Sequence, residues 1–206
     1  ATSNICTAQA LLATMAGFYA VYHGPEGILT IAERIHSIAV FLEESINRLG
    51  YKQVNAQYFD TLRFALPDTI SAQQIRTIAL SKEVNLRYFK NGDVGMSIDE
   101  TTDITAVNVL LSIFAIAAGR DWEKASDVPM ASSISAEMKR QSTYLTHEVF
   151  NKYHTETEMM RYIKRLDRKD ISLAHSMISL GSCTMKLNAA AEMLPLSRPE
   201  FMNMHP

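Results

Sequence analysis

The sequence is poor in the features that mark secreted, zinc-binding and membrane proteins. It has two cysteines, Cys6 and Cys183, and no CxxC pair, so neither a disulfide framework nor a cysteine-based zinc site can form. The longest apolar run, residues 106–119, is too short to span a bilayer and contains Asn108. No signal peptide is visible. The net charge of −2 gives no reason to expect nucleic acid or an anionic membrane as a partner.

The composition is typical of a globular protein, and the scarcity of cysteine favours a reducing compartment. Of its 206 residues, 47% are hydrophobic and 20% charged, and no repeat or low-complexity tract is present. This length predicts one large domain or two modest ones. The chain begins without Met and enters helical periodicity almost at once, so we expect it to be a piece of a longer protein.

Helical periodicity dominates the first fifty residues. Apolar residues recur at steps of three and four from Ile5 to Tyr22, and Gly24 with Pro25 is expected to end this helix. A second stripe follows at Ile28, Ile31, Ile35, Ile38, Leu42, Ile46 and Leu49. Gly50 is placed to cap that second helix in the left-handed conformation. Two long helices are therefore predicted.

The period then changes to that of a sheet. Residues 61–66 (TLRFAL) alternate as a half-buried strand does, and residues 84–90 and 93–98 are two further strand candidates. The pair Asn91-Gly92 predicts a type I′ hairpin between these two. Ser71 and Gln74 form a capping box for a short helix, and a helix is expected from Asp103 to Ala118, capped by Asp103 or Thr102. The order α-α-β-α-β-β-α predicts an α+β fold with an antiparallel sheet.

Periodicity is lost after Gly119. Residues 119–152 are predicted to be a linker with short helical pieces, because they contain Pro129 and several serines without a clean period. Thr155 and Glu158 then form a capping box for another helix, with methionines on one side and basic residues on the other. A solvated or partner-facing surface is expected there. A last short helix is predicted in AAAEML, ended by Pro195.

The loop LGSCTMKLN, residues 180–188, holds the residues most suited to chemistry. Gly181, Ser182 and Thr184 could cradle an anion ahead of a helix, or they could simply cap that helix. Lys186 could form a Schiff base if buried, or it could be solvated. Cys183 could act as a nucleophile with His175 as its base, although a lone cysteine is usually a small buried apolar residue.

A metal site is a weaker interpretation. His147, His154 and His175 occur near three glutamates, but position 151 is Asn, so the HExxH pattern fails. Solvated helix faces and caps explain these residues better. No metal is therefore expected.

Four long stretches closely resemble the P-protein of the glycine cleavage system, a pyridoxal-phosphate-dependent glycine decarboxylase. They are ATSNICTAQALLATMAGFYAVYHGPEGI, SIDETTD, HTETEMMRYIKRLDRKDISLAHSMI and LGSCTMKLN. This resemblance implies two homologous halves of fold type I, the aspartate-aminotransferase-like fold. Residues 1–118 would be the small domain that closes the first half, residues 119–152 a linker, and residues 153–206 the start of the catalytic half.

The resemblance also implies where the chemistry lies. The family's cofactor lysine lies further downstream, so Lys186 is not that lysine, and this chain is expected to contribute no catalytic and no cofactor-binding residue. Ser182, Cys183, Thr184 and Asn188 are expected to shape the pocket for glycine or the lipoyl arm, and their donors could hold the substrate carboxylate. Position 179 is Ser where the family usually has Pro, which leaves the entry to the loop less rigid.

The implied activity is decarboxylation of glycine, followed by transfer of the aminomethyl group to the lipoyl group of H-protein. The chain alone is expected to be inactive and to bind no pyridoxal phosphate. Expected partners are glycine, lipoylated H-protein and the other domains of the same enzyme, in a homodimer or two-subunit assembly, with no nucleic acid or membrane. The location would be cytoplasmic in a bacterium and the mitochondrial matrix in a eukaryote. Two rival interpretations are a small-molecule-binding or regulatory α+β module, and a Cys/His hydrolase.

Overall fold

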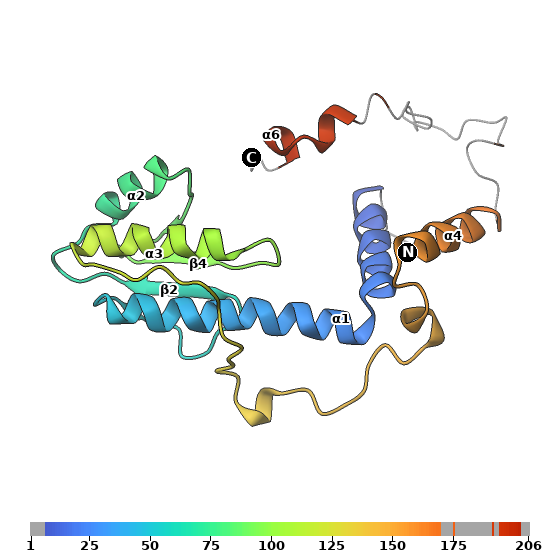
Figure 1. Cartoon of the computed structure of the whole chain (residues 1–206), viewed down its shortest axis with the longest axis horizontal. Coiled ribbons are helices and arrows are strands. Elements are labelled where there is room, and N and C mark those ends of the chain that lie inside the picture. Colours follow the sequence, from blue (N-terminus) through green and yellow to red (C-terminus); the bar gives the residue numbers. More distant parts are fainter. Residues whose placement is uncertain (1–6, 170–174, 176–190, 192–193, 203–206) are drawn as a thin grey trace. The chain divides into compact units, whose positions relative to one another are not determined.

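The computed structural model describes residues 7–169, 175, 191 and 194–202, in two compact units, 1–151 and 152–206. Figure 1 draws the chain coloured along its sequence, with its main elements labelled. The described elements of the first unit are α1 (Thr7–Arg48), β1 (Lys52–Gln53), β2 (Thr61–Ala65), α2 (Ala72–Ser81), β3 (Arg87–Tyr88), β4 (Val94–Ser97), α3 (Ile104–Ala118), η1 (Ala136–Met138) and η2 (Glu148–Asn151). The assignment of residues 1–118, 119–152 and 153–206 to parts of a longer enzyme stays a prediction.

The helix α1 is two helices joined at a sharp break, as predicted. Gly24 has φ 63° and ψ −177°, a combination that side-chain-bearing residues rarely adopt, and Pro25 follows it. The second part ends at Arg48, and Gly50 has φ 100°, with its N–H donating to Asn47 O at 2.9 Å. The predicted left-handed glycine at this end is confirmed.

Four antiparallel strands form the sheet, in the order β1-β2-β4-β3. Leu62 lies opposite Met96 and Phe64 opposite Val94, and all four side chains are buried on the same face. The predicted strand at residues 61–66 is confirmed. The two-residue strand β1, which pairs with the end of β2, was missed because so short a segment has no visible period.

The hairpin between β3 and β4 has a different turn from the one predicted. Phe89 N–H donates to Asp93 O at 2.9 Å, and Gly92 N–H donates to Phe89 O at 3.0 Å. Gly92 has φ 92°, but Asn91 keeps a negative φ, whereas a type I′ turn needs positive φ at both central residues. The type I′ prediction is therefore wrong, because a longer loop places only the glycine in the left-handed region.

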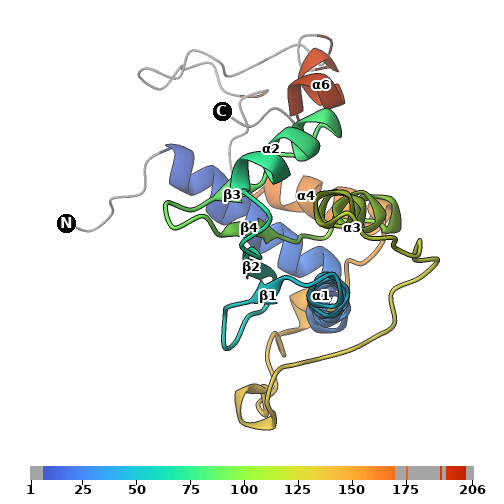
Figure 2. The same ribbon diagram turned by 90° about the vertical axis from the view of Figure 1, so that its left-hand side faces the viewer.

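Helices cover one face of this sheet and enclose the core. Figure 1 shows α1 and α3 running alongside β2 and β4, and Figure 2 shows the same layers from the end. Phe64 and Phe114 have no exposed surface and lie 5.7 Å apart between ring centroids. Burial of such side chains is the main stabilising term. Other core residues include Ile38, Leu42, Ile46, Leu62, Ile75, Val94, Met96, Val107, Leu111 and Ile113.

The predicted helix caps are largely confirmed. Ser71 Oγ accepts from Gln74 N–H at 3.1 Å, but the Gln74 side chain donates to Ala117 O on α3, so only one arm of that capping box is made. Asp103 caps α3 by accepting from Ala106 N–H at 2.8 Å. Gly119 ends the helix in the left-handed conformation, with φ 60°.

The second unit contains α4 (Glu156–Asp167), η3 (Leu194–Ser197) and α6 (Pro199–Met202). The predicted cap of α4 is present: Thr155 Oγ1 accepts from Glu158 N–H at 3.3 Å, and Thr155 Oγ1 and Glu158 Oε2 are also hydrogen-bonded. Most of the helix predicted at AAAEML lies outside the described residues. Of the helices that the structure describes, none combines the length and apolarity needed to cross a membrane.

Candidate functional site

The residues predicted to shape a substrate pocket cannot be placed. Ser182, Cys183, Thr184 and Asn188 lie outside the described residues, as does Lys186. His175 is described and lies exposed in a turn, but the Cys183 thiol proposed as its partner is not. The pocket assignment and the Cys/His hydrolase interpretation both stay untested. In the part of the chain that the structure does describe, no three His, Cys, Asp or Glu side chains gather as metal ligands would.

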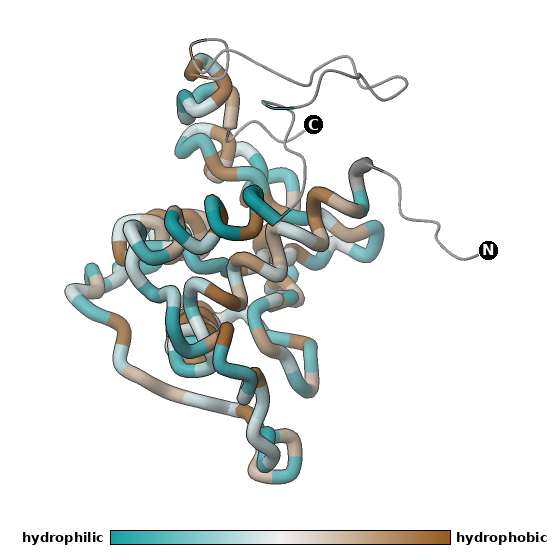
Figure 3. The backbone as a smooth tube through the Cα atoms, turned by 90° about the vertical axis from the view of Figure 1, so that its right-hand side faces the viewer, coloured by the Kyte–Doolittle hydropathy of each residue, from teal (hydrophilic) through white to brown (hydrophobic). Residues whose placement is uncertain are grey.

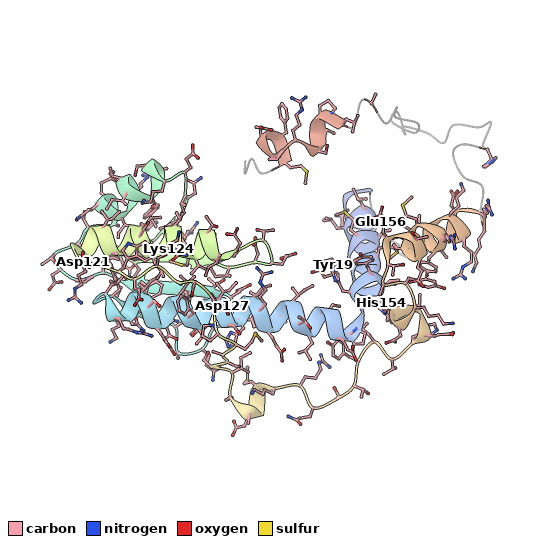
Figure 4. The ribbon with its side chains drawn as sticks, in the orientation of Figure 1. Tyr19, Asp121, Lys124, Asp127, His154 and Glu156 are labelled. Atoms are coloured by element: carbon pink, nitrogen blue, oxygen red, sulfur yellow. The ribbon has the colours of Figure 1, made fainter. Side chains whose placement is uncertain are left out.

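The most developed polar arrangement in the first unit holds down an extended segment. We call residues 120–133 the strap; it follows α3 and contains no helix or strand. Figure 4 labels three charged residues along it, Asp121, Lys124 and Asp127. They line a groove of about 570 Å³ together with residues of α1 and α3, among them Arg48. Side chains of these two helices fasten the strap at three points.

The first point is a buried asparagine on α3. Asn108 Nδ2 donates to Ala125 O at 2.9 Å, and Ala125 N–H donates to Asn108 Oδ1 at 2.9 Å. Both backbone polar groups of Ala125 are thus satisfied by one side chain, much as a neighbouring strand would satisfy them. Asn108 is only 6% exposed, so an unpaired amide there would be costly.

The second point is a buried serine on α1. Ser37 Oγ accepts from Ala131 N–H at 3.0 Å and lies 3.0 Å from Ala131 O and 2.7 Å from Glu33 O. A hydroxyl has one proton, so it serves one of these two carbonyls at a time while accepting from the strap amide. Ser37 is 2% exposed.

The third point is His36, beside Ser37 and equally buried. Ser133 N–H donates to His36 Nε2 at 3.0 Å, so this nitrogen is the acceptor of a neutral ring. Nδ1 then carries the proton and donates to Phe59 O at 2.8 Å. The ring also stacks on Phe59, with centroids 5.7 Å apart and planes 4° apart. His36 therefore joins the strap to the loop that precedes β2.

A tyrosine beside this histidine completes the polar cluster. Tyr58 lies 5.8 Å from His36 between ring centroids, and its hydroxyl donates to the Glu43 carboxylate. Burial, followed by this hydrogen bond to Glu43, raises the pKa of Tyr58 to about 12. The hydroxyl therefore stays protonated at neutral pH and acts as a fixed donor. The cluster is suited to holding backbone in place rather than to proton transfer.

Beyond the strap, the chain returns to the break in α1. The Tyr144 hydroxyl donates to Pro25 O at 2.6 Å, directly after Gly24. The short helix η2 also packs against α1 before the first unit ends at Asn151. Residues 119–152 were predicted to be a linker with short helical pieces; the structure gives them few elements, but fastens them along the first unit.

The open face of the sheet carries a separate cationic cluster. Arg63 Nε donates to Asp93 Oδ2 at 2.6 Å, and its guanidinium lies 4.3 Å from the Phe89 ring centroid. Arg87 lies 5.7 Å from the same centroid. Gly95 leaves room for this ring, because a Cβ there would come within 2.9 Å of Phe89. Arg63, Arg87, Phe89 and Gly95 line a cavity of about 1100 Å³.

The lysines of the described residues differ in exposure from a lysine that holds pyridoxal phosphate. A lysine that forms a Schiff base with this cofactor must be shielded so that its amine is neutral and nucleophilic. Within the described ranges, every lysine is exposed except Lys82, which is half-exposed.

Sequence reasoning missed the three strap anchors. One signal was present: Asn108 interrupts an apolar run, and a buried polar side chain needs a partner. His36 and Ser37 gave no such signal, because they fall among alternating apolar and polar residues of a helix, and their partners are about 95 positions away.

Comparison with known proteins identifies the family. The family model described as "Glycine cleavage system P-protein" matches residues 1–114. The whole chain is 82% identical to a glycine dehydrogenase (decarboxylating) of Bacteroides fragilis, 80% identical to one of Bacteroides thetaiotaomicron and 52% identical to one of Flavobacterium johnsoniae. It spans about a fifth of the length of these curated relatives, covering 22%, 22% and 21% of them. The chain belongs to the glycine cleavage system P-protein family.

Proposed function

We propose that this chain acts as part of a P-protein that decarboxylates glycine and transfers the remaining aminomethyl group to the lipoyl group of H-protein. The observation that carries the proposal is the 82% identity over the entire chain to a glycine dehydrogenase (decarboxylating). Pyridoxal phosphate, bound elsewhere in the longer protein, would supply the electron sink for decarboxylation. Glycine, lipoylated H-protein and the other domains of the same enzyme are the proposed partners.

The architecture supports a scaffolding role for the first unit. We assign residues 1–118 to the small α+β domain that closes one fold type I half; the four-stranded antiparallel sheet and its covering helices, seen in the described part of this range, support the assignment. We assign residues 119–152 to the connection and residues 153–206 to the start of the catalytic half. Ser182, Cys183, Thr184 and Asn188 are proposed to shape the pocket of that half. A homodimer or a two-subunit assembly, in the cytoplasm of a bacterial cell, completes the proposal.

The test compares this chain with a longer P-protein that contains it. Each is mixed with pyridoxal phosphate, glycine and lipoylated H-protein, and exchange of labelled bicarbonate into the glycine carboxyl group is measured. We expect exchange with the longer protein and none with the chain alone. Exchange by the chain alone would overturn its assignment as a non-catalytic part. A longer protein that binds pyridoxal phosphate but gives no exchange would overturn the proposed reaction.

A second candidate is a small-molecule-binding or regulatory module. The cavity of about 1100 Å³ beside Arg63 and Arg87 favours it, because guanidinium groups bind carboxylates and phosphates. Arg63 is already paired with Asp93, which weakens this candidate. Calorimetric titration of this chain with citrate and with inorganic phosphate tests it. Heat of binding that Arg87→Ala removes would favour a regulatory module, and no heat would argue against one.

A further inference from the structure

We propose that Asn108, Ser37 and His36 are positioning residues: they fasten the strap to the first unit, so that the chain leaves this unit at one fixed place, the break in α1. The proposal rests on the proposed function for its effect on activity, because the catalytic pocket is placed in the part of the protein that follows. None of the three is proposed to touch substrate or cofactor.

The strap depends on these side chains because it has no secondary structure of its own. The backbone N–H groups of Ala125, Ala131 and Ser133 donate to side-chain atoms of Asn108, Ser37 and His36. All three acceptor residues are buried, at 6%, 2% and 2% exposure. A backbone group that loses its partner in such a place costs free energy unless the whole segment leaves. The strap is therefore held at specific positions rather than loosely laid over an apolar surface.

The path beyond the strap ends at a defined point. Tyr144 donates to Pro25 O, and η2 packs against α1. Both contacts follow the strap in the sequence. If the strap came away from α1 and α3, only these two contacts would hold the rest of the segment to the first unit. With the strap fastened, residues 120–133 are held against α1 and α3 and do not form a free tether.

Chain statistics give the size of the effect. A flexible tether of about 30 residues has a root-mean-square end-to-end distance of about 30 Å. Effective concentration falls with roughly the −3/2 power of tether length, so freeing the whole segment would lower it on the order of tenfold. The fastened strap thus keeps the residues that follow it close to the first unit.

The first measurement is hydrogen exchange in the longer P-protein that contains this chain. We expect the amides of Ala125, Ala131 and Ser133 to exchange slowly despite lying outside helices and strands. Ser37→Ala removes the acceptor of the Ala131 N–H and should speed exchange of that amide about fivefold to tenfold. Ser112→Ala is the matched control, because Ser112 is also buried on a helix but its hydroxyl donates to Val109 O of that helix. Rapid exchange of these amides in the unaltered protein would overturn the proposal that α1 and α3 hold the strap in place.

The second measurement is the rate of glycine–bicarbonate exchange in the same protein. The double variant Ser37→Ala/Asn108→Ala should lower kcat at unchanged pyridoxal phosphate content, by less than the roughly tenfold loss expected for freeing the whole segment, because His36 and Tyr144 keep their contacts. KM for glycine should change little, because the anchors do not contact glycine. The matched control Ser112→Ala should keep the kcat of the unaltered protein. If the double variant does not fold, Ser37→Ala alone decides the question, with a smaller decrease expected.

The two proposals fail in different ways. If the unaltered protein gives no exchange reaction, the proposed function fails, while hydrogen exchange still tests the strap. If the strap amides lose protection in Ser37→Ala and kcat stays unchanged, the positioning role is overturned although the proposed function stands. An equal loss of kcat in Ser112→Ala would also overturn it, since the Ser112 hydroxyl donates within α3 and not to the strap.

Discussion

The two parts of α1 look alike in sequence and differ in what they contact. Before Gly24, Leu11, Leu12 and Met15 are 61%, 65% and 58% exposed. After Gly24, Ile38, Leu42 and Ile46 are 4%, 0% and 0% exposed. Figure 3 shows hydrophobic positions at intervals along the first part, next to the end marked N. An apolar stripe of helical period therefore predicts a helix correctly in both parts, but it does not predict what covers that stripe.

The cause of the difference is the break at Gly24. The second part of α1 runs alongside the sheet and α3, so its stripe becomes one wall of the core. The first part leaves that direction, and the described residues of the first unit do not cover its apolar side chains near Leu12. Substitutions that act on one part and spare the other can test this division.

The largest effect is expected from truncating the buried stripe. Leu42→Ala should lower the free energy of unfolding by about 2–5 kcal/mol, because it removes buried methyl groups and leaves a cavity among core residues. Chemical denaturation of this chain, followed by circular dichroism, measures the change. A loss below about 1 kcal/mol would show that this site is less tightly packed than its complete burial indicates.

The next effect concerns the break that separates the two parts. Gly24→Ala should destabilise the chain by about 1–3 kcal/mol, because φ 63° with ψ −177° is a region that only glycine enters readily. Gly17→Ala is the control, since Gly17 lies inside the helix and an added Cβ would meet nothing within 4 Å beyond its chain neighbours and the backbone of its own helix. Alanine favours the helix there, so stability should rise by about 0.5–1 kcal/mol. Thermal unfolding of both variants measures these changes. If Gly24→Ala unfolded at the same temperature as the unaltered chain, the backbone at Gly24 would not require glycine.

Much of the fold could be predicted from sequence because local chemistry decided it. Gly24, Gly50, Ser71 and Asp103 end or begin helices through backbone preferences and side-chain caps that act within a few residues. The alternation in β2 likewise follows from burial on one face. The hairpin turn was predicted less well, since Asn91-Gly92 occurs in more than one turn type and loop length decides between them.

The strap could not be predicted, for a physical reason. Its hydrogen bonds join positions far apart, such as Ser37 with Ala131, and they form only once the helices have packed. No local pattern in residues 120–133 records the partners. The candidate pocket residues, from Ser182 to Asn188, were found only through resemblance to a family, and they lie outside the described residues.

A smaller effect is expected where α1 meets α3. The Tyr51 hydroxyl donates to Phe114 O at 2.8 Å, and burial raises the pKa of Tyr51 to about 12. Between pH 10 and pH 12 the unfolded chain loses the tyrosine proton while the folded chain keeps it, so stability falls as pH rises. Tyr51→Phe should cost about 1 kcal/mol at pH 7. It should also make the decline above pH 10 shallower, with Tyr58 still contributing.

Unfolding by urea at a series of pH values measures both effects on the same samples. The sign is opposite to that of a paired carboxylate, whose stabilisation is lost at low pH. If Tyr51→Phe and the unaltered chain declined equally above pH 10, Tyr51 would not be the protonated donor that the buried contact requires.

The smallest effect is expected on the exposed stripe, and it completes the comparison with Leu42. Leu12→Ala removes the same atoms as Leu42→Ala, but Leu12 is 65% exposed, so this chain should lose less than about 0.5 kcal/mol. The same substitution in a longer P-protein tests whether the stripe is covered by other parts of that protein or exposed to water. A loss of about 2 kcal/mol or more there would mean that other parts of the protein cover the stripe, because only buried methyl groups are so costly to remove. An equally small loss in both would mean that the stripe stays in water, and the two parts of α1 would then differ in role as well as in burial.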